Sequence, residues 1–436
     1  MKIIIILLVM IAAYAAANWR KLSVELCMLS SAVAGGIAGA LIVQAPPFSQ
    51  LARHLVEGTF TYLDVILVFC TATIFITIIA ESGGVNYVVR GIIKTFYYKR
   101  VVVLLLLMFV ILIPGALTGA GSISILTVGT PCALALGYLG IPKKRVAAIL
   151  FIIAGLSAAA PPINIWAMII SAGTAIPYVG FELPLGIPVL LLGAFTIFAL
   201  GWKRENKMEL AEVLKDMPEV PAGMSLWRVL LPFLVFFGLV IVSRIWPFTL
   251  PVLGLPLEFT IAAAVALLIS PKRIKFLTLS RDTVKRLLPL LATMAIVGSL
   301  QQIMTVTGVR GLISFAVLST PLLLLYILLI LIIPISEGIL TYGGAAIIGI
   351  PLVWFFDSIG LHATVVIAGL SLIWPLGDGL PPTALIGRLT VMFTKYEGTY
   401  WSFLKATWLP WAVITIVGIL MVIYSSELSF LVRWSM

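Results

Sequence analysis

The chain has 436 residues, of which 62% are hydrophobic and only 10% charged, and its mean hydropathy is +1.19. A soluble domain carries about 25% charged residues, so this composition excludes an ordinary soluble enzyme or nucleic-acid-binding domain. The formal net charge of +11 instead indicates Lys and Arg gathered in the cytoplasmic loops of a membrane protein.

Apolar runs of the ~20 residues needed to cross a bilayer recur along the chain. The sequence lacks the alternating pattern of a transmembrane barrel, so it predicts an all-α polytopic membrane protein. Its localisation is then integral to a membrane, and the prokaryotic cytoplasmic (inner) membrane is the expected one.

The first half is predicted to begin with a scaffold, residues 1–98. The positive charges of Arg20 and Lys21 follow its first apolar run, which favours a retained helix with an outside N-terminus over a cleaved signal peptide. A polar connector is expected at 46–57. The helices of this scaffold are expected at 2–17, 24–45, 59–80 and 85–98. The last of them is amphipathic and is expected to lie in the membrane interface.

A re-entrant helical hairpin is predicted at 99–142. Its two apolar runs flank a Gly-rich break between Gly115 and Ser122, and basic residues at both ends place both ends in the cytoplasm. The next crossing, 143–173, is predicted to be broken at Pro161-Pro162, because proline cannot continue a helix. The first repeat, 1–202, is completed by a span at 185–202, and a cytoplasmic linker at 203–225 follows it.

The second half, residues 226–436, repeats this plan. Its parts are expected to be a scaffold at 226–319, a hairpin at 320–358, a broken helix at 361–395 and a last span at 406–425. The scaffold is expected to contain spans at 227–245, 250–270 and 287–305, a basic cytoplasmic stretch at 272–286 and a short helix at 309–319. The break of the second hairpin is expected around 336–344.

The two hairpin-and-break segments align without a gap. Pro114 to Pro162 matches Pro334 to Pro382 at a constant offset, since 334 − 114 and 382 − 162 both equal 220. Each half then has five crossings and one hairpin, and an odd number of crossings inverts the second half and leaves both termini outside. Two inverted-topology repeats, each with a re-entrant hairpin and a broken helix, are typical of an elevator-type secondary transporter. A single Pro-Pro kink, without the duplication, would indicate only packing.

A helix broken in mid-membrane exposes N–H groups that suit a carboxylate and carbonyl groups that suit Na⁺. The residues expected to contact substrate are Thr118, Gly119, Gly121, Ser122, Pro161, Pro162, Asn164, Thr341, Gly343, Pro381, Pro382 and Thr383. The candidate Na⁺ ligands are Ser122, Ser124, Asn164, Ser336, Gly377 and Asp378. Each Ser or Thr has the alternative role of bonding a carbonyl of its own helix.

Two acids, Glu337 and Asp378, lie in apolar surroundings, where acids are usually functional. Either is a cation ligand or sits at a solvated mouth, and Asp378 is the preferred ligand because it lies inside a break. Arg388 either faces an anionic substrate or anchors the inner leaflet. No His, Cys and Asp cluster suggests catalysis, so no enzyme and no cofactor other than Na⁺ are expected.

The stretch from Gly115 to Ser122, with Pro131, Gly137-Tyr138 and Pro161-Pro162-Ile163, resembles the large membrane (DctM-like) subunit of TRAP transporters, in the ion-transporter superfamily. The second half carries similar features at Gly338 to Gly344, Pro351, Leu380-Pro381-Pro382 and Gly387. The resemblance implies an elevator carrier of organic anions, often C4-dicarboxylates, by Na⁺ symport. It also implies two partners, a small four-helix membrane subunit and an extracytoplasmic solute-binding protein.

The sequence departs from that family at Asn164, at Thr341-Tyr342 and at Leu380. No four-helix segment is fused to the chain. A stand-alone carrier similar to divalent-anion:sodium symporters is therefore the alternative, and a passive channel is a further one.

Overall fold

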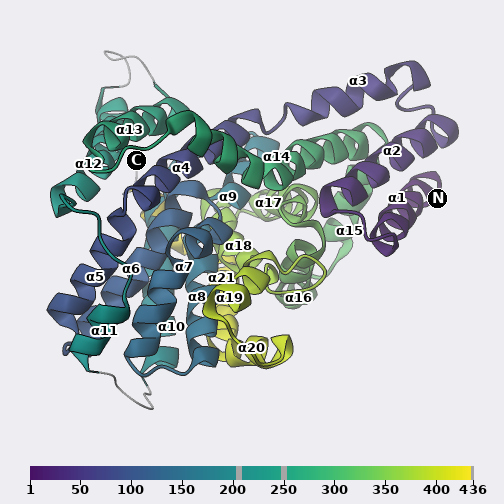
Figure 1. Cartoon of the computed structure of the whole chain (residues 1–436). Coiled ribbons are helices and arrows are strands. Elements are labelled where there is room, and N and C mark those ends of the chain that lie inside the picture. Colours follow the sequence, from purple (N-terminus) through teal and green to yellow (C-terminus); the bar gives the residue numbers. More distant parts are fainter. Residues whose placement is uncertain (203–208, 247–252, 434–436) are drawn as a thin grey trace.

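The computed structural model describes residues 1–202, 209–246 and 253–433, and every regular element in these ranges is a helix (Figure 1). Within them, nine helices are long and apolar enough to cross a membrane, and one bent helix pair would make a tenth. The prediction of an all-helical polytopic integral membrane protein is confirmed. Parts of the linker at 203–225 and of the span at 250–270 lie outside the described residues, as do 434–436.

The helices of the first half follow the order of the apolar runs. They are α1 (Lys2–Trp19), α2 (Val24–Ile42), α3 (Phe48–Thr59), α4 (Leu63–Glu81), α5 (Gly84–Phe96), α6 (Arg100–Thr118), α7 (Gly121–Tyr138), α8 (Lys143–Ala159), α9 (Ile165–Thr174) and α10 (Glu182–Gly201). Two residues join α6 to α7, and five residues that include Pro161-Pro162 separate α8 from α9.

The second half contains a comparable series. Its helices are α11 (Leu210–Asp216), α12 (Leu226–Ile245), α13 (Leu255–Ile269), α14 (Phe276–Val306), α15 (Val309–Ser319), α16 (Leu322–Leu340), a π-helix (Ala345–Gly349), α17 (Ile350–Ser358), α18 (Ala363–Gly377), α19 (Leu385–Thr394), α20 (Tyr400–Ala406), α21 (Trp408–Ile423), a 3₁₀ turn (Glu427–Ser429) and α22 (Phe430–Arg433). Seven residues that include Pro381-Pro382 separate α18 from α19.

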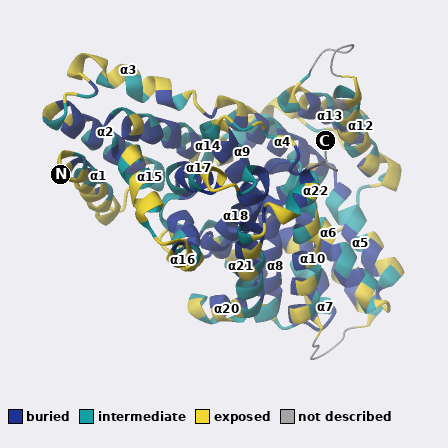
Figure 2. Ribbon diagram, turned by 180° about the vertical axis from the view of Figure 1, so that it is seen from behind, coloured by how far each residue is buried: buried dark blue, intermediate teal, exposed yellow. Residues whose placement is uncertain are grey.

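The core is formed by α8 and α18, which lie at the centre of the molecule (Figure 2). Every residue from Val146 to Ala159 and from Thr364 to Gly377 is buried. The hairpin helices α6 and α16 pack on α8 and α18 respectively, while α1–α4 and α12–α15 form an outer group in which the long α14 contacts α2, α3 and α4. The sequences of α8 and α18 are hydrophobic without a polar face, and such a sequence predicts a helix that is buried on all sides.

Three of the polar segments contain helices. Residues 46–57 include most of α3, which packs along α14, where Gly58 and Gly298 allow close approach and Ser299 Oγ donates to the Leu55 carbonyl at 2.6 Å. The basic stretch 272–286 is mostly the first three turns of α14. The linker contains α11, whose Val213 is fully buried.

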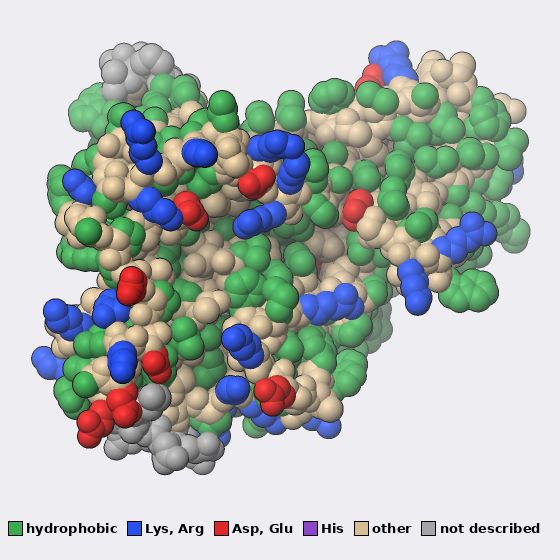
Figure 3. All heavy atoms as spheres, viewed as in Figure 1, with side chains coloured by type: hydrophobic (Ala, Val, Ile, Leu, Met, Phe, Trp, Pro, Cys, Tyr) green, Lys and Arg blue, Asp and Glu red, His purple; other side chains and the backbone are tan. Residues whose placement is uncertain are grey.

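The polar segments assigned to one side of the membrane lie together. Lys272 Nζ is 3.0 Å from Glu81 Oε1, and Arg90 Nη1 donates to the Met217 carbonyl at 3.2 Å. At the base of the first hairpin, Arg100 donates to carbonyl groups at the ends of α7 and α10, at 2.9 and 2.6 Å. Figure 3 shows Lys and Arg mainly over the left part of the molecule, whereas hydrophobic side chains dominate the right.

Candidate functional site

The first interruption, between α8 and α9, is closed by the side chain of Asn164. Its Nδ2 donates to the Ala159 carbonyl at 3.0 Å, and its Oδ1 accepts from the Ala167 N–H at 2.9 Å. The Tyr178 hydroxyl donates to the Pro162 carbonyl at 3.1 Å and accepts from the Asn164 N–H at 3.0 Å. Several of the backbone groups that a broken helix leaves unpaired are thus bonded within the protein, and Asn164 serves as the cap of α9.

Ser124 repairs the hydrogen-bond ladder of α6. Pro114 lies inside that helix and has no N–H to donate, and the next N–H, that of Gly115, donates to Ser124 Oγ at 2.9 Å. Ser124 Oγ in turn donates to the Ile111 carbonyl at 2.8 Å and lies 3.0 Å from Ser157 Oγ. This hydroxyl group joins the two helices of the hairpin, because Ser124 of α7 bonds to two backbone groups of α6.

The other candidates at the first tip are tightly packed. Thr118 Oγ1 donates to a carbonyl one turn earlier in α6 at 2.7 Å. Gly119 ends α6 with φ +72°, a conformation that favours glycine. A Cβ on Gly121 would overlap the Ala154 carbonyl oxygen and would lie 2.6 Å from Ile386 Cδ1. Gly121 therefore allows α7 to approach α8 and α19, rather than a ligand.

Ser122 is the candidate of the first half that faces open space. It is 3% exposed, makes no hydrogen bond within the described residues, and lines a cavity of about 560 Å³ between α4, α7, α14 and α19. The polar residues around this cavity are Thr73, Thr77, Glu81, Ser122, Thr127, Thr283 and Arg286.

At the second tip, α16 continues to Leu340, so Ser336 lies in its last two turns and not in the expected break. Ser336 Oγ donates to the Ile333 carbonyl at 2.8 Å and accepts from Trp374 Nε1 at 3.4 Å. The turn itself is formed by residues 341–344, and Thr341 adopts φ +51° there. Its neighbour Gly343 packs against Met28 of α2 and Val297 of α14, so the second tip contacts the outer group of helices.

The second interruption is also closed by internal bonds. The Gly377 carbonyl accepts from the Leu380 N–H at 2.7 Å, so this predicted Na⁺ ligand already has a partner. Thr383 donates to the Gly338 carbonyl through its N–H at 3.2 Å and through its hydroxyl at 3.0 Å. These bonds join α16 to the break.

Glu337 and Asp378 form a buried acidic pair at this junction. They are 0% and 4% exposed, and their carboxyl groups interact with each other. Both oxygens of Glu337 and Oδ1 of Asp378 lack a hydrogen-bond partner among the described residues. Trp166 of α9 lies beside Glu337 without a hydrogen bond from its Nε1, and the Trp166 ring packs against Tyr342 at 5.4 Å between centroids. The second hairpin, the second break and α9 therefore meet around two buried carboxyl groups.

The proline pairs lie apart from these groups. Pro161 and Pro162 line an apolar cavity of about 580 Å³ with residues of α6, α10 and α12. Pro381 and Pro382 line another, of about 600 Å³, with residues of α1, α14 and α16. The structure thus does not bring the four prolines into one site.

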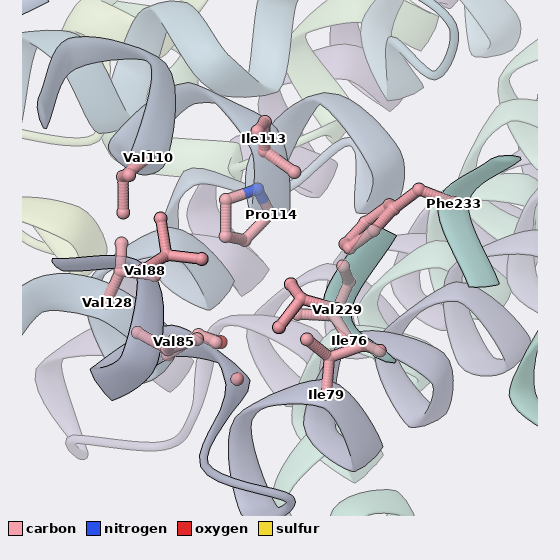
Figure 4. A pocket seen from close by; sticks show the side chains of 12 residues that line it. Ile76, Ile79, Val85, Val88, Val110, Ile113, Pro114, Val128, Val229 and Phe233 are labelled. Carbon is pink, nitrogen blue, oxygen red and sulfur yellow. The ribbon is translucent and has the colours of Figure 1, made fainter. Parts of the chain in front are cut away.

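A smaller apolar pocket, of about 80 Å³, lies between α4, α5, α6, α7 and α12 (Figure 4). The side chains labelled in Figure 4 are all aliphatic, proline or phenylalanine, and they include Pro114 and Phe233. Apart from the hydroxyl group of Thr127 the lining is apolar, so we interpret this pocket as a packing gap.

Sequence reasoning missed two residues. Arg286 was predicted only as part of the basic cytoplasmic stretch 272–286, which the structure places largely in α14. Trp166 follows the Pro-Pro break by one turn, and no feature of the sequence connects it with Glu337.

No known protein family and no curated protein matches the sequence. Two solved structures share its fold. The YdaH transporter of Alcanivorax borkumensis aligns with a TM-score of 0.58 and 13% identity, over 87% of this chain and 89% of that one. MtrF of Neisseria gonorrhoeae, described as illuminating a class of antimetabolite efflux pumps, aligns with a TM-score of 0.63 and 14% identity, over 88% and 85%.

At these identities the likeness establishes the fold alone. Neither neighbour is a TRAP large subunit, so the resemblance of the two break regions to that family is not supported by them.

Proposed function

We propose that the chain is a cation-coupled secondary transporter of small organic anions that carry one or two carboxylate groups. The single observation that carries the proposal is the acidic pair of Glu337 and Asp378. Two buried acids without a neutralising partner are costly, and intramembrane acids mark ion pathways in transporters. The fold shared with the YdaH and MtrF transporters supports the same class.

The position of the pair favours cation binding. Glu337 lies in the last turn of α16, and Asp378 is the C-cap of α18. The C-terminal end of a helix carries partial negative charge, so both acids stand where a cation is stabilised. Carboxylate oxygens are ligands that hard cations prefer, and Na⁺ is the coupling ion that we propose first.

Contacts at equivalent ends of the two halves support the inverted repeat. Arg100 joins the base of the first hairpin to the ends of α7 and α10. In the second half, the His362 N–H donates to Ser425 Oγ at 3.2 Å and Ser426 Oγ donates to the Gly360 carbonyl at 2.9 Å, which joins the base of the second hairpin to the end of α21. We propose that hairpins and broken helices move together against α1–α4 and α12–α15, as in an elevator.

The test is uptake of radiolabelled mono- and dicarboxylates by liposomes that contain the purified chain alone, with an imposed Na⁺ gradient or an imposed pH gradient. We expect accumulation above the outside concentration, and loss of that accumulation in Glu337→Gln and Asp378→Asn. Glu57→Gln is the matched control, because Glu57 is an exposed acid paired with Arg53.

Uptake that stops at equal concentrations under every gradient would indicate a passive channel instead. Accumulation that appears only after the small four-helix subunit and a binding protein are added would return the protein to the TRAP-type assembly.

A further inference from the structure

The cavity between α4, α7, α14 and α19 has the features of an anion site. Arg286 lines it and has no ion-pair partner among the described residues. The acid of the same wall, Glu81, is already paired with Lys272 at 3.0 Å. The Arg286 side chain is exposed, so a solvated positive charge borders about 560 Å³ of space.

Two helix N-termini end at this cavity. α7 begins at Gly121 and α19 begins at Leu385, and neither has a side-chain cap. Their first N–H groups carry partial positive charge. The N-terminus of α7 follows the first hairpin tip, and the N-terminus of α19 follows the second interruption. Although these segments are far apart in sequence, both N-termini lie at this cavity.

Two buried hydroxyl groups give an observation independent of the helix ends. Ser122 on α7 and Thr283 on α14 are 3% and 6% exposed, line the cavity from opposite walls, and make no hydrogen bond within the described part of the chain. Buried hydroxyl groups normally have a partner, so these two are available to a bound molecule.

The rest of the lining is apolar, with Leu126, Leu287, Leu290, Leu385 and Leu389 around the polar groups. We propose that this cavity binds the transported anion, with Arg286, Ser122, Thr283 and the two helix N-termini around its charged group and the leucines around an apolar body. The chemical class is a small carboxylate or sulfonate with a hydrocarbon part. This inference rests on the proposed function and locates its substrate.

The position of the cavity suits an elevator. α4 and α14 belong to the group of helices proposed as the scaffold, and α7 and α19 to the proposed mobile unit. A substrate held between them is released from α4 and α14 when the mobile unit moves, and Arg286 stays with the scaffold.

The test measures anion preference without transport. A single cysteine is placed at Ser122 or at Thr283 in a chain whose Cys27, Cys70 and Cys132 are replaced by alanine. Each purified protein is treated with two thiol reagents of similar size, the anionic sulfonatoethyl and the cationic trimethylammonioethyl methanethiosulfonate. The labelling rate of each cysteine with each reagent is divided by the rate at which the same reagent reacts with free 2-mercaptoethanol, which removes the difference in intrinsic reactivity between the two reagents.

We expect both cysteines to prefer the anionic reagent. Arg286→Gln should lower the anionic-to-cationic ratio about fivefold or more, because one unit charge at about 8 Å in water acts on the two reagents in opposite directions. Arg286→Lys keeps the charge and should keep the preference. Arg281→Gln is the matched control, because Arg281 is an exposed arginine of α14 that does not line the cavity.

A ratio that Arg286→Gln leaves unchanged at both positions, or no labelling at either, would overturn the proposal. Because no gradient and no uptake enter this experiment, a protein that fails the liposome assay can still show the anion preference, and the reverse also holds.

Discussion

Gly155 of α8 packs against Pro375 of α18, and an ideal Cβ on Gly155 would lie 3.3 Å from the Pro375 Cβ. The two residues occupy equivalent positions of the repeat, since 375 − 155 equals the offset of 220 that relates Pro114 to Pro334. Contact between equivalent residues is what a two-fold axis between the halves produces. The predicted inverted repeat would have its axis between α8 and α18, at the centre of the molecule.

The contact predicts a steric limit at Gly155. Gly155→Val adds three carbon atoms where one already touches Pro375, and we expect the free energy of unfolding to fall by about 1–3 kcal/mol. Gly137→Val, in α7, is the control, because nothing lies within 4 Å of a Cβ there. Thermal unfolding in detergent, followed by tryptophan fluorescence, measures both. Equal midpoints for the two variants would contradict the close packing of α8 on α18.

The role of Ser124 is tested by removing its hydroxyl. Ser124→Ala leaves the buried Gly115 N–H and the Ile111 carbonyl without this partner, so we expect a loss of about 1–3 kcal/mol in the free energy of unfolding. Ser157→Ala should cost less, because its principal bond is to a carbonyl of its own helix. A fully stable Ser124→Ala whose uptake loses its dependence on Na⁺ would instead support the sequence-based assignment of Ser124 as a Na⁺ ligand.

A graded series tests Asn164. Asn164→Ala removes a bond on each side of the first break, and we expect a loss of about 2 kcal/mol in the free energy of unfolding, one for the cap and one for the second bond. Asn164→Ser keeps a hydroxyl that can cap α9 and should lose about half as much. The thermal midpoints should follow the order wild type, Ser, Ala, and the reverse order of Ser and Ala would contradict the capping role.

The sequence predicted what depends on local chemistry. The helical class follows from composition, and the interruptions follow from residues such as Pro161-Pro162 and Gly119, whose backbone preferences act within a few residues. The division into two repeats, the inverted topology and the elevator motion stay predictions. So does the assignment of individual substrate ligands, although the structure gives Asn164 and Ser124 backbone partners.

What the sequence did not predict depends on contacts between distant segments. The sequence shows only that Ser124 carries a hydroxyl oxygen that could bind a cation. The packing of α7 on α6 shows that this oxygen already accepts a hydrogen bond from the Gly115 N–H. Arg286 was placed only in a basic cytoplasmic stretch, because charge alone does not show that this stretch forms the first turns of α14. Trp166 and Glu337 are 171 residues apart by their numbers, 337 − 166, and only the fold brings them together.

The last prediction concerns the interaction of Glu337 with Asp378. Glu337→Gln keeps the shape of the side chain and removes one of two neighbouring buried carboxyl groups. Burial of an ionisable group without a partner is costly, so we expect a higher thermal midpoint in detergent near neutral pH. Asp378→Asn should act in the same direction. Because either change removes the same pairwise interaction, the double variant should gain less than the sum of the two, with a coupling of about 0.5–3 kcal/mol.

Additive effects would mean that the two carboxyl groups do not act as a pair, and the argument for a shared cation would then fail. Glu57→Gln is again the control and should leave the midpoint nearly unchanged, because exposed ion pairs contribute about 0–1 kcal/mol. Addition of Na⁺ should raise the midpoint of the wild type, since a ligand of the folded state stabilises it, and should raise it less in Glu337→Gln. This difference separates a bound cation from simple screening, which would act on both proteins alike.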